Sequence, residues 1–215
     1  MVPSDINLFN IATSWKVLNT NNSLLTINLD DEYANLIGGK ITLPSFDTNG
    51  RPIKIVGTLN KGTNITDIYF LNNSEYIKVA DSSCRNLSKL NRIYLPNTII
   101  EIGNEAFYWT YSYGGTSILK LEQLPSSIEK LGDRAFAGCI EISISSLPTG
   151  LKKIGTQCFS GCYKVSVNNF SNNGLTIGYQ AFYHAGNSVV VNDDSQKTIK
   201  IENGVTLEKD DEGNY

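Results

Sequence analysis

The sequence predicts a parallel β-solenoid, in which coils of one repeated length stack along one axis. A segment made of an aliphatic residue, Gly, two variable residues, a small residue and Phe occurs four times, in "EIGNEAF", "KLGDRAF", "KIGTQCF" and "TIGYQAF". Its glycines occupy positions 103, 132, 155 and 178, at successive intervals of 29, 23 and 23. Short segments that alternate apolar and polar residues recur in the same phase. Because a unit this short cannot enclose a hydrophobic core alone, the units must stack and cover one another.

Residues 1–40 are expected to form an N-terminal β cap. The stretch "SWKVLNTNNSLLTINLDDEY" contains two alternating runs on either side of Asn-Asn, a pattern typical of a β-hairpin. A cover is needed here because the end coil of a solenoid would otherwise expose its apolar columns. The side chains available to cover it are those of Trp15, Val17, Leu25, Ile27 and Leu29.

Residues 41–193 make up the expected solenoid. Counting back from Gly103 by the same interval of 23 reaches Ala80, and a second such step reaches Gly57, so the phase extends toward the N-terminus. A second landmark precedes the glycine segments, in "ITLP" (41–44), "IYLP" (93–96), "EQLP" (122–125) and "SSLP" (145–148). Three alternating segments are predicted to be strands with one buried face: "LKL" (119–121), "ISI" (142–144) and "VSV" (165–167). Proline ends such a strand because it has no N–H to donate.

Equivalent residues of successive coils should form columns through the core. One predicted column fills the interior and contains Cys84, Phe107, Phe136, Phe159 and Phe182. The other is small and allows the coils to approach closely; it contains Ser83, Ala106, Ala135, Cys158 and Ala181. The repeated glycine marks either a positive φ angle or a tight contact between coils.

Two of the units carry a resemblance to a known family. The segments "EQLPSSIEKLGDRAFAGC" and "SSLPTGLKKIGTQCFSGC" resemble the BspA-like leucine-rich repeats, a class with 23-residue units. The resemblance covers roughly residues 41–193. It implies a right-handed leucine-rich repeat solenoid of about six coils, with short parallel strands on one face and short helices or turns on the opposite face. It also implies a bacterial cell-surface or secreted protein that serves adhesion or protein binding and has no catalytic activity.

Residues 194–215 are expected to form a C-terminal cap and tail. The preceding segment "NSVVVNDDS" keeps the strand of the last unit. Within "KTIKIENGVTLEKDDEGNY" one or two strands are predicted around "ENG", followed by a charged tail.

Composition argues against several classes of partner. The 215 residues carry a net charge of −3 and give a pI of about 5.2, so no basic footprint for nucleic acid or an anionic membrane is present. The N-terminus shows no signal-peptide pattern, and no apolar run approaches the ~20 residues that a spanning helix needs. We therefore expect no nucleic-acid partner and no membrane insertion.

The residues that could carry chemistry do not form a catalytic or metal-binding set. Cys139 and Cys162 are equivalent residues of adjacent coils, so they are either buried thiols or a disulfide. Cys158 and Cys162 are repeat-slot residues, and the chain has a single histidine to join them as a metal ligand. That histidine, His184, has no nucleophile set beside it in any motif. The sequence therefore predicts no enzyme activity, no metal and no cofactor.

The candidate binding residues lie mainly in an insertion. The 29-residue unit holds six surplus residues, and there Tyr108, Trp109, Tyr111 and Tyr113 follow the core residue Phe107. Tyr and Trp are enriched among binding anchors, and flat aromatic faces also suit sugar stacking. These rings either fold back onto the coils or form a recognition loop. Residues equivalent in position, which would continue an aromatic patch, are Tyr183 and His184.

The outward positions of the predicted strand face are polar and read as a solvated surface. They are Lys120, Glu122, Glu141, Ser143, Lys164, Ser166 and Asn168. Two hypotheses about function stay open. The first is a non-catalytic surface or secreted module that binds a protein of a host or a bacterium. The second is a carbohydrate-binding or receptor-binding module, of a phage or a cell wall, that uses the aromatic insertion.

Overall fold

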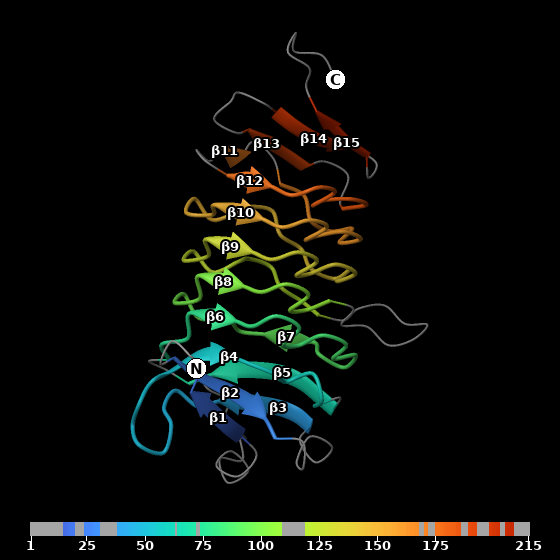
Figure 1. Cartoon of the computed structure of the whole chain (residues 1–215). Helices are drawn as coiled ribbons and strands as arrows, with labels where there is room; N and C mark the ends of the chain where they lie inside the picture. The colour runs from blue at the N-terminus through green and yellow to red at the C-terminus, as the bar shows by residue number, and fades with distance from the viewer. Residues whose placement is uncertain are drawn as a thin grey trace.

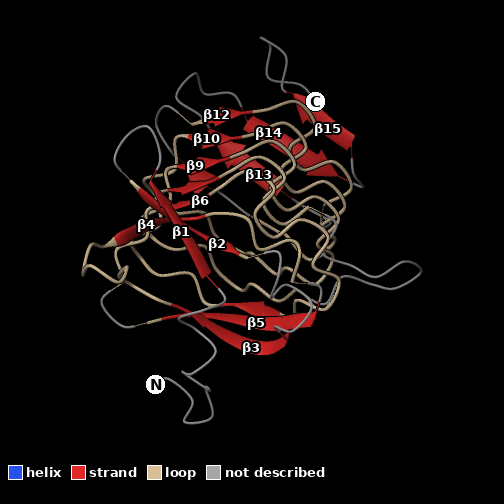
Figure 2. Ribbon diagram, turned by 60° about the horizontal axis from the view of Figure 1, so that its bottom comes forward, coloured by secondary structure: helices blue, strands red, loops and turns tan. Residues whose placement is uncertain are grey.

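The computed structural model describes residues 15–19, 24–30, 38–62, 64–71, 74–108, 119–167, 170–171, 175–185, 189–192, 198–202 and 205–208. The chain winds into coils that stack from the N-terminal to the C-terminal end of the molecule (Figure 1). Figure 2 shows the largest sheet and strands β3 and β5 on different sides of the coils.

The largest sheet runs along the whole stack. Among the described residues it has eight strands, in the order β1-β2-β4-β6-β8-β9-β10-β12. Their bounds are β1 (Trp15–Asn19), β2 (Leu25–Leu29), β4 (Ile53–Val56), β6 (Lys78–Val79), β8 (Glu101–Ile102), β9 (Lys130–Leu131), β10 (Lys153–Ile154) and β12 (Thr176–Ile177). β1 and β2 pair antiparallel and the later neighbours pair parallel.

Two smaller sheets complete the described strands. The second sheet is parallel and consists of β3 (Gly38–Leu43), β5 (Asn64–Phe70) and β7 (Arg92–Ile93). The third sheet lies at the C-terminal end and consists of β11 (Phe170–Ser171), β13 (Val189–Asn192), β14 (Thr198–Glu202) and β15 (Val205–Glu208). β14 and β15 pair antiparallel, which confirms the strands predicted around "ENG". The predicted charged tail after β15 lies outside the described residues.

Strand pairing confirms the repeat register read from the sequence. Val79 pairs with Ile102, Ile102 with Leu131, and Leu131 with Ile154. These are the aliphatic positions directly before the glycine slot. Because Ile102 and Leu131 pair across the 29-residue unit, the main sheet keeps its register through the insertion.

The strands predicted at 119–121, 142–144 and 165–167 are wrong as strands, although their burial pattern is right. The inward side chains Ile142, Ile144, Val165 and Val167 are buried, as the alternation indicated. The segment 119–121 makes one isolated bridge, and 142–144 and 165–167 are irregular. Backbone donors at 143 and 166 reach the previous coil at 3.0 Å, but proline or irregular chain follows before a regular ladder can extend. The continuous ladder lies one segment later, before each glycine.

The N-terminal hairpin forms as the alternating runs predicted. β1 and β2 pair antiparallel from Trp15 with Leu29 to Asn19 with Leu25. β2 then pairs with β4 and so joins the main sheet next to the first coil. The side chains of Leu25, Ile27 and Leu29 are buried in the core, and Val17 packs against it. The side chain of Trp15 lies outside the described part of the structure.

The aromatic column of the core is confirmed. The rings of Phe107 and Phe136 stack with centroids 5.2 Å apart, and those of Phe159 and Phe182 stack at 5.5 Å. Cys84 continues the column and is fully buried. Ring stacking and burial along the axis therefore join each coil to the next.

The repeated glycine serves a close contact between coils, and the positive-φ alternative is wrong for it. A Cβ on Gly132 would lie 2.5 Å from the backbone of Gly103 and Asn104 in the preceding coil. The left-handed residue comes two positions after the glycine, with φ of 52° at Arg134 and 54° at Gln157. Gly132 itself is not among the described residues with a positive φ.

The side of the coils opposite the main sheet contains turns. In the part of the chain that the structure describes, no residue is in a helix, so the short helices allowed by the family resemblance are absent there. Within the same residues, no segment is found that could cross a membrane as a helix.

Candidate binding surfaces

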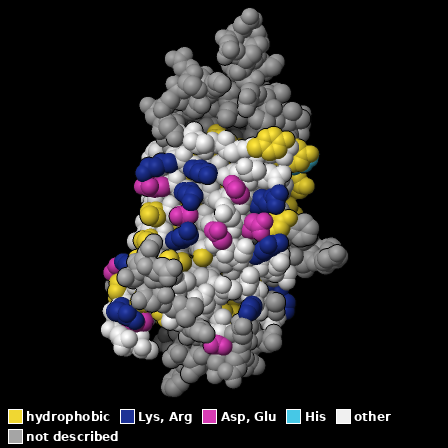
Figure 3. All heavy atoms as spheres, viewed as in Figure 1, with side chains coloured by type: hydrophobic (Ala, Val, Ile, Leu, Met, Phe, Trp, Pro, Cys, Tyr) yellow, Lys and Arg dark blue, Asp and Glu magenta, His cyan; other side chains and the backbone are white. Residues whose placement is uncertain are grey.

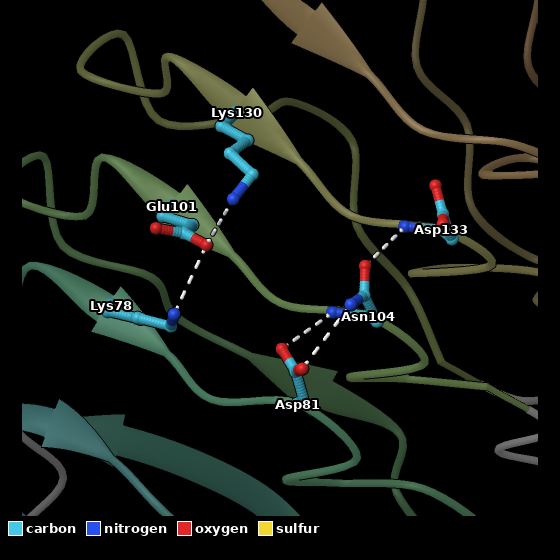
Figure 4. A network of polar contacts seen from close by, with 6 residues as sticks. All are labelled: Lys78, Asp81, Glu101, Asn104, Lys130 and Asp133. Atoms are coloured by element: carbon cyan, nitrogen blue, oxygen red, sulfur yellow. Dashed lines mark hydrogen bonds and ion pairs between the residues drawn. The ribbon is translucent and has the colours of Figure 1, made fainter. Parts of the chain in front are cut away.

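The face of the main sheet is covered by paired charges. The carboxylate of Glu101 accepts hydrogen bonds from Lys78 Nζ at 3.1 Å and Lys130 Nζ at 2.8 Å, one from the coil on each side (Figure 4). Burial alone would raise the pKa of Glu101, but the hydrogen bonds from both lysines outweigh it and lower that pKa. Figure 3 shows basic and acidic side chains interspersed over this face. Glu101 and its two lysines therefore satisfy one another's charges across three coils.

The residues predicted to point outward between 120 and 168 carry mixed charge. Those that the structure describes lie on irregular segments, each of which precedes a main-sheet strand along the chain. Within them Lys164 Nζ donates to Glu141 Oε2 of the preceding coil at 2.6 Å. Ser143 and Ser166 follow the same outward phase and are exposed and half-buried, respectively. Asn168 lies outside the described residues.

A second ladder follows the glycine column. Asp81 Oδ1 accepts the backbone N–H of Asn104 at 2.9 Å, and Asn104 Oδ1 accepts that of Asp133 at 2.8 Å (Figure 4). Asp133 Oδ1 in turn accepts the N–H of Thr156 at 2.9 Å. These carboxylate and amide oxygens tie one coil to the next. Among the described residues, no group of His, Cys, Asp and Glu could hold a metal ion.

The cysteines are buried thiols. None of the four forms a disulfide bond, so Cys139 and Cys162 are not joined to each other. Each donates its S–H to a carbonyl of the preceding coil: Cys139 to Phe107 O and Cys162 to Phe136 O, both at 3.1 Å. Burial raises the pKa of Cys84 to about 12, which keeps this thiol protonated and unreactive.

The predicted aromatic patch is not continuous. Trp109, Tyr111 and Tyr113 lie outside the described residues, so whether they face the coils stays a prediction. Tyr108 lies under the guanidinium of Arg85, with the cation 5.2 Å from the ring centroid. Its equivalents in the next two coils are Ala137 and Ser160, and only the third is aromatic, Tyr183. Small side chains therefore separate Tyr108 from Tyr183.

Tyr183 and His184 belong instead to an aromatic surface of the last described coils. We call Tyr163, Tyr179, Tyr183 and His184 the C-terminal aromatic surface. Tyr179 is 74% exposed and Tyr163 64%, the largest values among the exposed large hydrophobic side chains of the described residues. The coils of Tyr163 and Tyr183 are joined by the hydrogen bond from Gly161 N to Tyr183 O, at 2.8 Å. Figure 3 shows hydrophobic side chains gathered along the right-hand edge over these coils.

His184 has a conformational role in this surface. Its φ is 51°, and equivalent positions of other coils are filled by Asn86 (φ 61°), Gly138 (80°) and Gly161 (73°). Left-handed backbone favours Gly and Asn, and it tolerates His. The imidazole packs against Tyr183, with ring centroids 4.0 Å apart. His184 therefore ends the turn and supports the tyrosine ring.

A groove lies between the coil of β7 and the coil that follows the insertion. Its volume is about 630 Å³, and we call it the coil-junction groove. The exposed or partly exposed polar side chains that line it are Arg92, Tyr94, Asn97, Lys120, Glu122 and Gln123. Buried side chains below them are Ile93, Leu121 and Leu124.

The insertion explains why the groove opens here. Arg92 pairs with Lys120, an interval one residue shorter than the one between Ile102 and Leu131 in the main sheet. The segment "KLEQLP" has one residue more than its counterpart "RIYLP", so the chain leaves register after the Arg92–Lys120 bridge. In the described part of the chain the second sheet has no strand beyond β7. The coils therefore separate on this side while the main sheet holds them together.

Tyr94, which lines one wall of the groove, stacks on a second tyrosine, Tyr69. The rings of Tyr69 and Tyr94 stack with centroids 4.5 Å apart and 14° between their planes. Burial and the hydrogen bond with Tyr94 raise the pKa of Tyr69, and the charge of Arg92 acts against them. Tyr94 remains 46% exposed.

Comparison with known families and structures explains this architecture. A family model described as the BspA type leucine-rich repeat region matches residues 79–205 with six copies. The chain belongs to the BspA-type leucine-rich repeat family. Among curated proteins, none matches this member of the family.

Solved structures show that this BspA-type chain shares its fold with other leucine-rich repeat proteins. A leucine-rich repeat protein of T. pallidum is 21% identical, with a TM-score of 0.56 over 80% of this chain and 87% of that one. A leucine-rich cell surface protein of Faecalibacterium prausnitzii is 18% identical, with a TM-score of 0.54 over 94% of this chain and 58% of that one. The likeness shows a parallel leucine-rich repeat solenoid.

Sequence reasoning missed the coil-junction groove of this BspA-type solenoid. The tyrosines were visible in "DIYF" and "RIYLP", each directly after a buried isoleucine and therefore outward by the period-two rule. The outward residues predicted to form a surface begin at Lys120, so Tyr69 and Tyr94 of the earlier units lie outside that prediction.

Proposed function

We propose that this chain is a non-catalytic binding module that holds a partner protein on its C-terminal aromatic surface. The observation that carries the proposal is the exposure of Tyr179 and Tyr163, at 74% and 64%, on adjacent coils of a rigid stack. Tyrosine supplies a large contact area with little rotamer entropy and is enriched at the anchors of protein interfaces. Membership of a repeat family supports this role, because solenoids present extended surfaces to partners.

The framework behind these tyrosines favours a preformed contact. Tyr179 O accepts the backbone N–H of Gln157 at 2.9 Å, and Gly161 N donates to Tyr183 O at 2.8 Å. The neighbouring Phe182 is stacked on Phe159 in the core. Because these contacts fix the backbone under the surface to the preceding coil, little conformational entropy is lost when a partner binds.

We further propose that the module acts at a bacterial cell surface or after secretion, in adhesion. The F. prausnitzii relative is named a cell surface protein, which supports this location. No catalytic set was found in the sequence, and the thiols described above are buried, which supports a role in binding and not in chemistry.

Site-specific photo-cross-linking tests the protein partner. A benzophenone amino acid replaces Tyr179 in one variant and Lys152, an exposed residue of the main sheet face, in a control variant. Both are irradiated with extracts of surface proteins. We expect a discrete protein adduct from position 179 alone. An excess of the protein without the benzophenone should abolish this adduct by competition. The same excess of the double variant Tyr163→Ala, Tyr179→Ala should not abolish it. Equal adducts from both positions, or equal competition by the double variant, would refute the proposal.

A further inference from the structure

We propose that the coil-junction groove is a binding site for an acidic sugar, a hexuronate unit of a polysaccharide. This site is separate from the C-terminal aromatic surface and goes beyond the protein binding proposed above. The hexuronate ring would stack on Tyr94, and its carboxylate would be held by Arg92 and Lys120. The volume of about 630 Å³ lies within the range of about 300–1,000 Å³ that is usual for small-ligand sites.

The first argument is the free face of an aromatic ring. Tyr69 and Tyr94 come from the segments of neighbouring strands β5 and β7, so their stack runs along the axis from coil to coil. Tyr69 covers one face of the Tyr94 ring, and the other face is directed toward the following coil, which forms the opposite wall of the groove. A pyranose ring presents a flat set of C–H groups, which packs well on the negative face of an aromatic ring. The sugar would therefore take the place of the next ring in the stack.

The second argument is an excess of positive charge at the groove. Strand pairing places Arg92 beside Lys120 in the groove, and Glu122 is the acidic side chain among the groove residues, so two cations face one carboxylate. In the described part of the chain the ion pairs involve neither Arg92 nor Lys120. Three lysines on or beside the main sheet differ, because Lys78, Lys130 and Lys152 each pair with a glutamate, whereas Lys153 of β10 is in none of the ion pairs of the described residues. Two adjacent cations suit a carboxylate ligand, which the guanidinium can bind in a bidentate manner.

The remaining polar groups of the groove suit sugar hydroxyls. Asn97 Oδ1 already accepts the backbone N–H of Ser126 at 3.3 Å, which leaves the Nδ2 group of Asn97 as a donor. Glu122 and Gln123 line the same groove and supply acceptors, and Gln123 supplies a further donor. Hydroxyl groups both donate and accept, so they match this mixture. A uniformly anionic peptide offers carboxylates but no pyranose ring to stack on Tyr94, so we expect it to bind more weakly than a uronate oligomer.

Calorimetric titration with defined oligomers tests the site. The probes are an α-1,4-linked galacturonate trimer, a hyaluronan tetrasaccharide, the neutral galactose trimer and a hexaglutamate peptide, with the full chain at 0.1 M salt. We expect binding of at least one uronate oligomer, with the neutral trimer at least about 10-fold weaker because the charge-assisted hydrogen bonds are missing. The first two probes distinguish a pectin-like from a glycosaminoglycan-like source of the same uronate chemistry.

Variants connect binding to the groove. Lys120→Gln and Tyr94→Ala should each weaken uronate binding about 10-fold. Lys153→Gln and Tyr179→Ala are matched controls, because they change an exposed lysine and an exposed tyrosine outside the groove. Both should leave uronate binding unchanged. Lys120→Gln removes no described ion pair, so it keeps the test valid if Tyr94→Ala alters the fold. The proposal is overturned if no uronate oligomer binds, if the neutral trimer binds equally, or if hexaglutamate binds equally and Tyr94→Ala has no effect. None of these outcomes affects the cross-linking at Tyr179.

Discussion

The ring of Phe136 lies parallel to the ring of Phe159 in the next coil, with centroids 5.5 Å apart and 1° between the planes. Both rings are fully buried. Phe136→Ala should lower the free energy of unfolding by about 3–5 kcal/mol, because it removes a buried ring and leaves a cavity between two stacked neighbours. Chemical denaturation measures the change.

Tyr163→Ala is the matched control for this substitution, because Tyr163 is 64% exposed. Its effect should stay within about 0.5 kcal/mol. Similar losses for the two variants would show that the aromatic column does not hold the coils together.

The glycine column predicts an unusual response to a small substitution. Gly132→Ala would bring a methyl group within 2.5 Å of backbone atoms in the preceding coil, which cannot move as a side chain would. We expect a loss of about 1–3 kcal/mol, the range for overpacking in a tight core. Gly150→Ala is the control, because nothing lies within 4 Å of the added Cβ. It should be neutral or slightly stabilising, and thermal melts of the two variants that coincide would contradict the close-contact role.

The ion pairs of Glu101 should make the free energy of unfolding depend on pH in the acid range. Hydrogen bonds from Lys130 and Lys78 lower its pKa in the folded state, against the opposing effect of burial. A lowered pKa gives stability that is present above the unfolded value of about 4.3 and is lost as pH falls through the folded value. Glu101→Gln should therefore reduce stability at pH 7 and reduce the further loss between pH 5 and pH 3. Denaturation across this pH range measures both, with Glu129→Gln, an exposed pair to Lys152, as the control.

The cysteine thiols should be unreactive in the folded protein. Burial raises the pKa of Cys84 to about 12 and also raises that of Cys162. A disulfide-exchange reagent at pH 8 should label none of the four cysteines in the native state and all four after unfolding. Labelling of only two in the unfolded, unreduced chain would reveal a disulfide.

The sequence was sufficient to predict the repeat and its register, but not to predict which segment of each coil forms a strand. The phase of the glycines predicted which residues meet, and Val79, Ile102 and Leu131 pair in that phase. The strands themselves were misplaced, because alternation reports which side chains are buried and not which backbone groups find partners. Thus Ile142 and Ile144 are buried without a strand.

The coil-junction groove was harder to predict, because it arises where the sequence interval between paired residues differs between the second sheet and the main sheet. The bridge from Arg92 to Lys120 and the pair of Ile102 and Leu131 differ by one residue, and the groove opens at that difference. Counting the repeat along the glycine positions alone cannot show this one-residue difference. The predicted Tyr183 and His184 contact each other on the coil next to that of Tyr163, and the small side chains of two coils separate them from Tyr108. The expected domain boundaries at 40 and 193 stay predictions.

The pairing of each coil only with its neighbours has a mechanical consequence. A molecule pulled at its two ends would lose coils one at a time, and each rupture would release a fixed length of chain. A 23-residue unit corresponds to about 8 nm of extended chain, and the 29-residue unit to about 10 nm. A force–extension record would therefore contain one longer step among equal ones, and that step would mark the coil beside the groove.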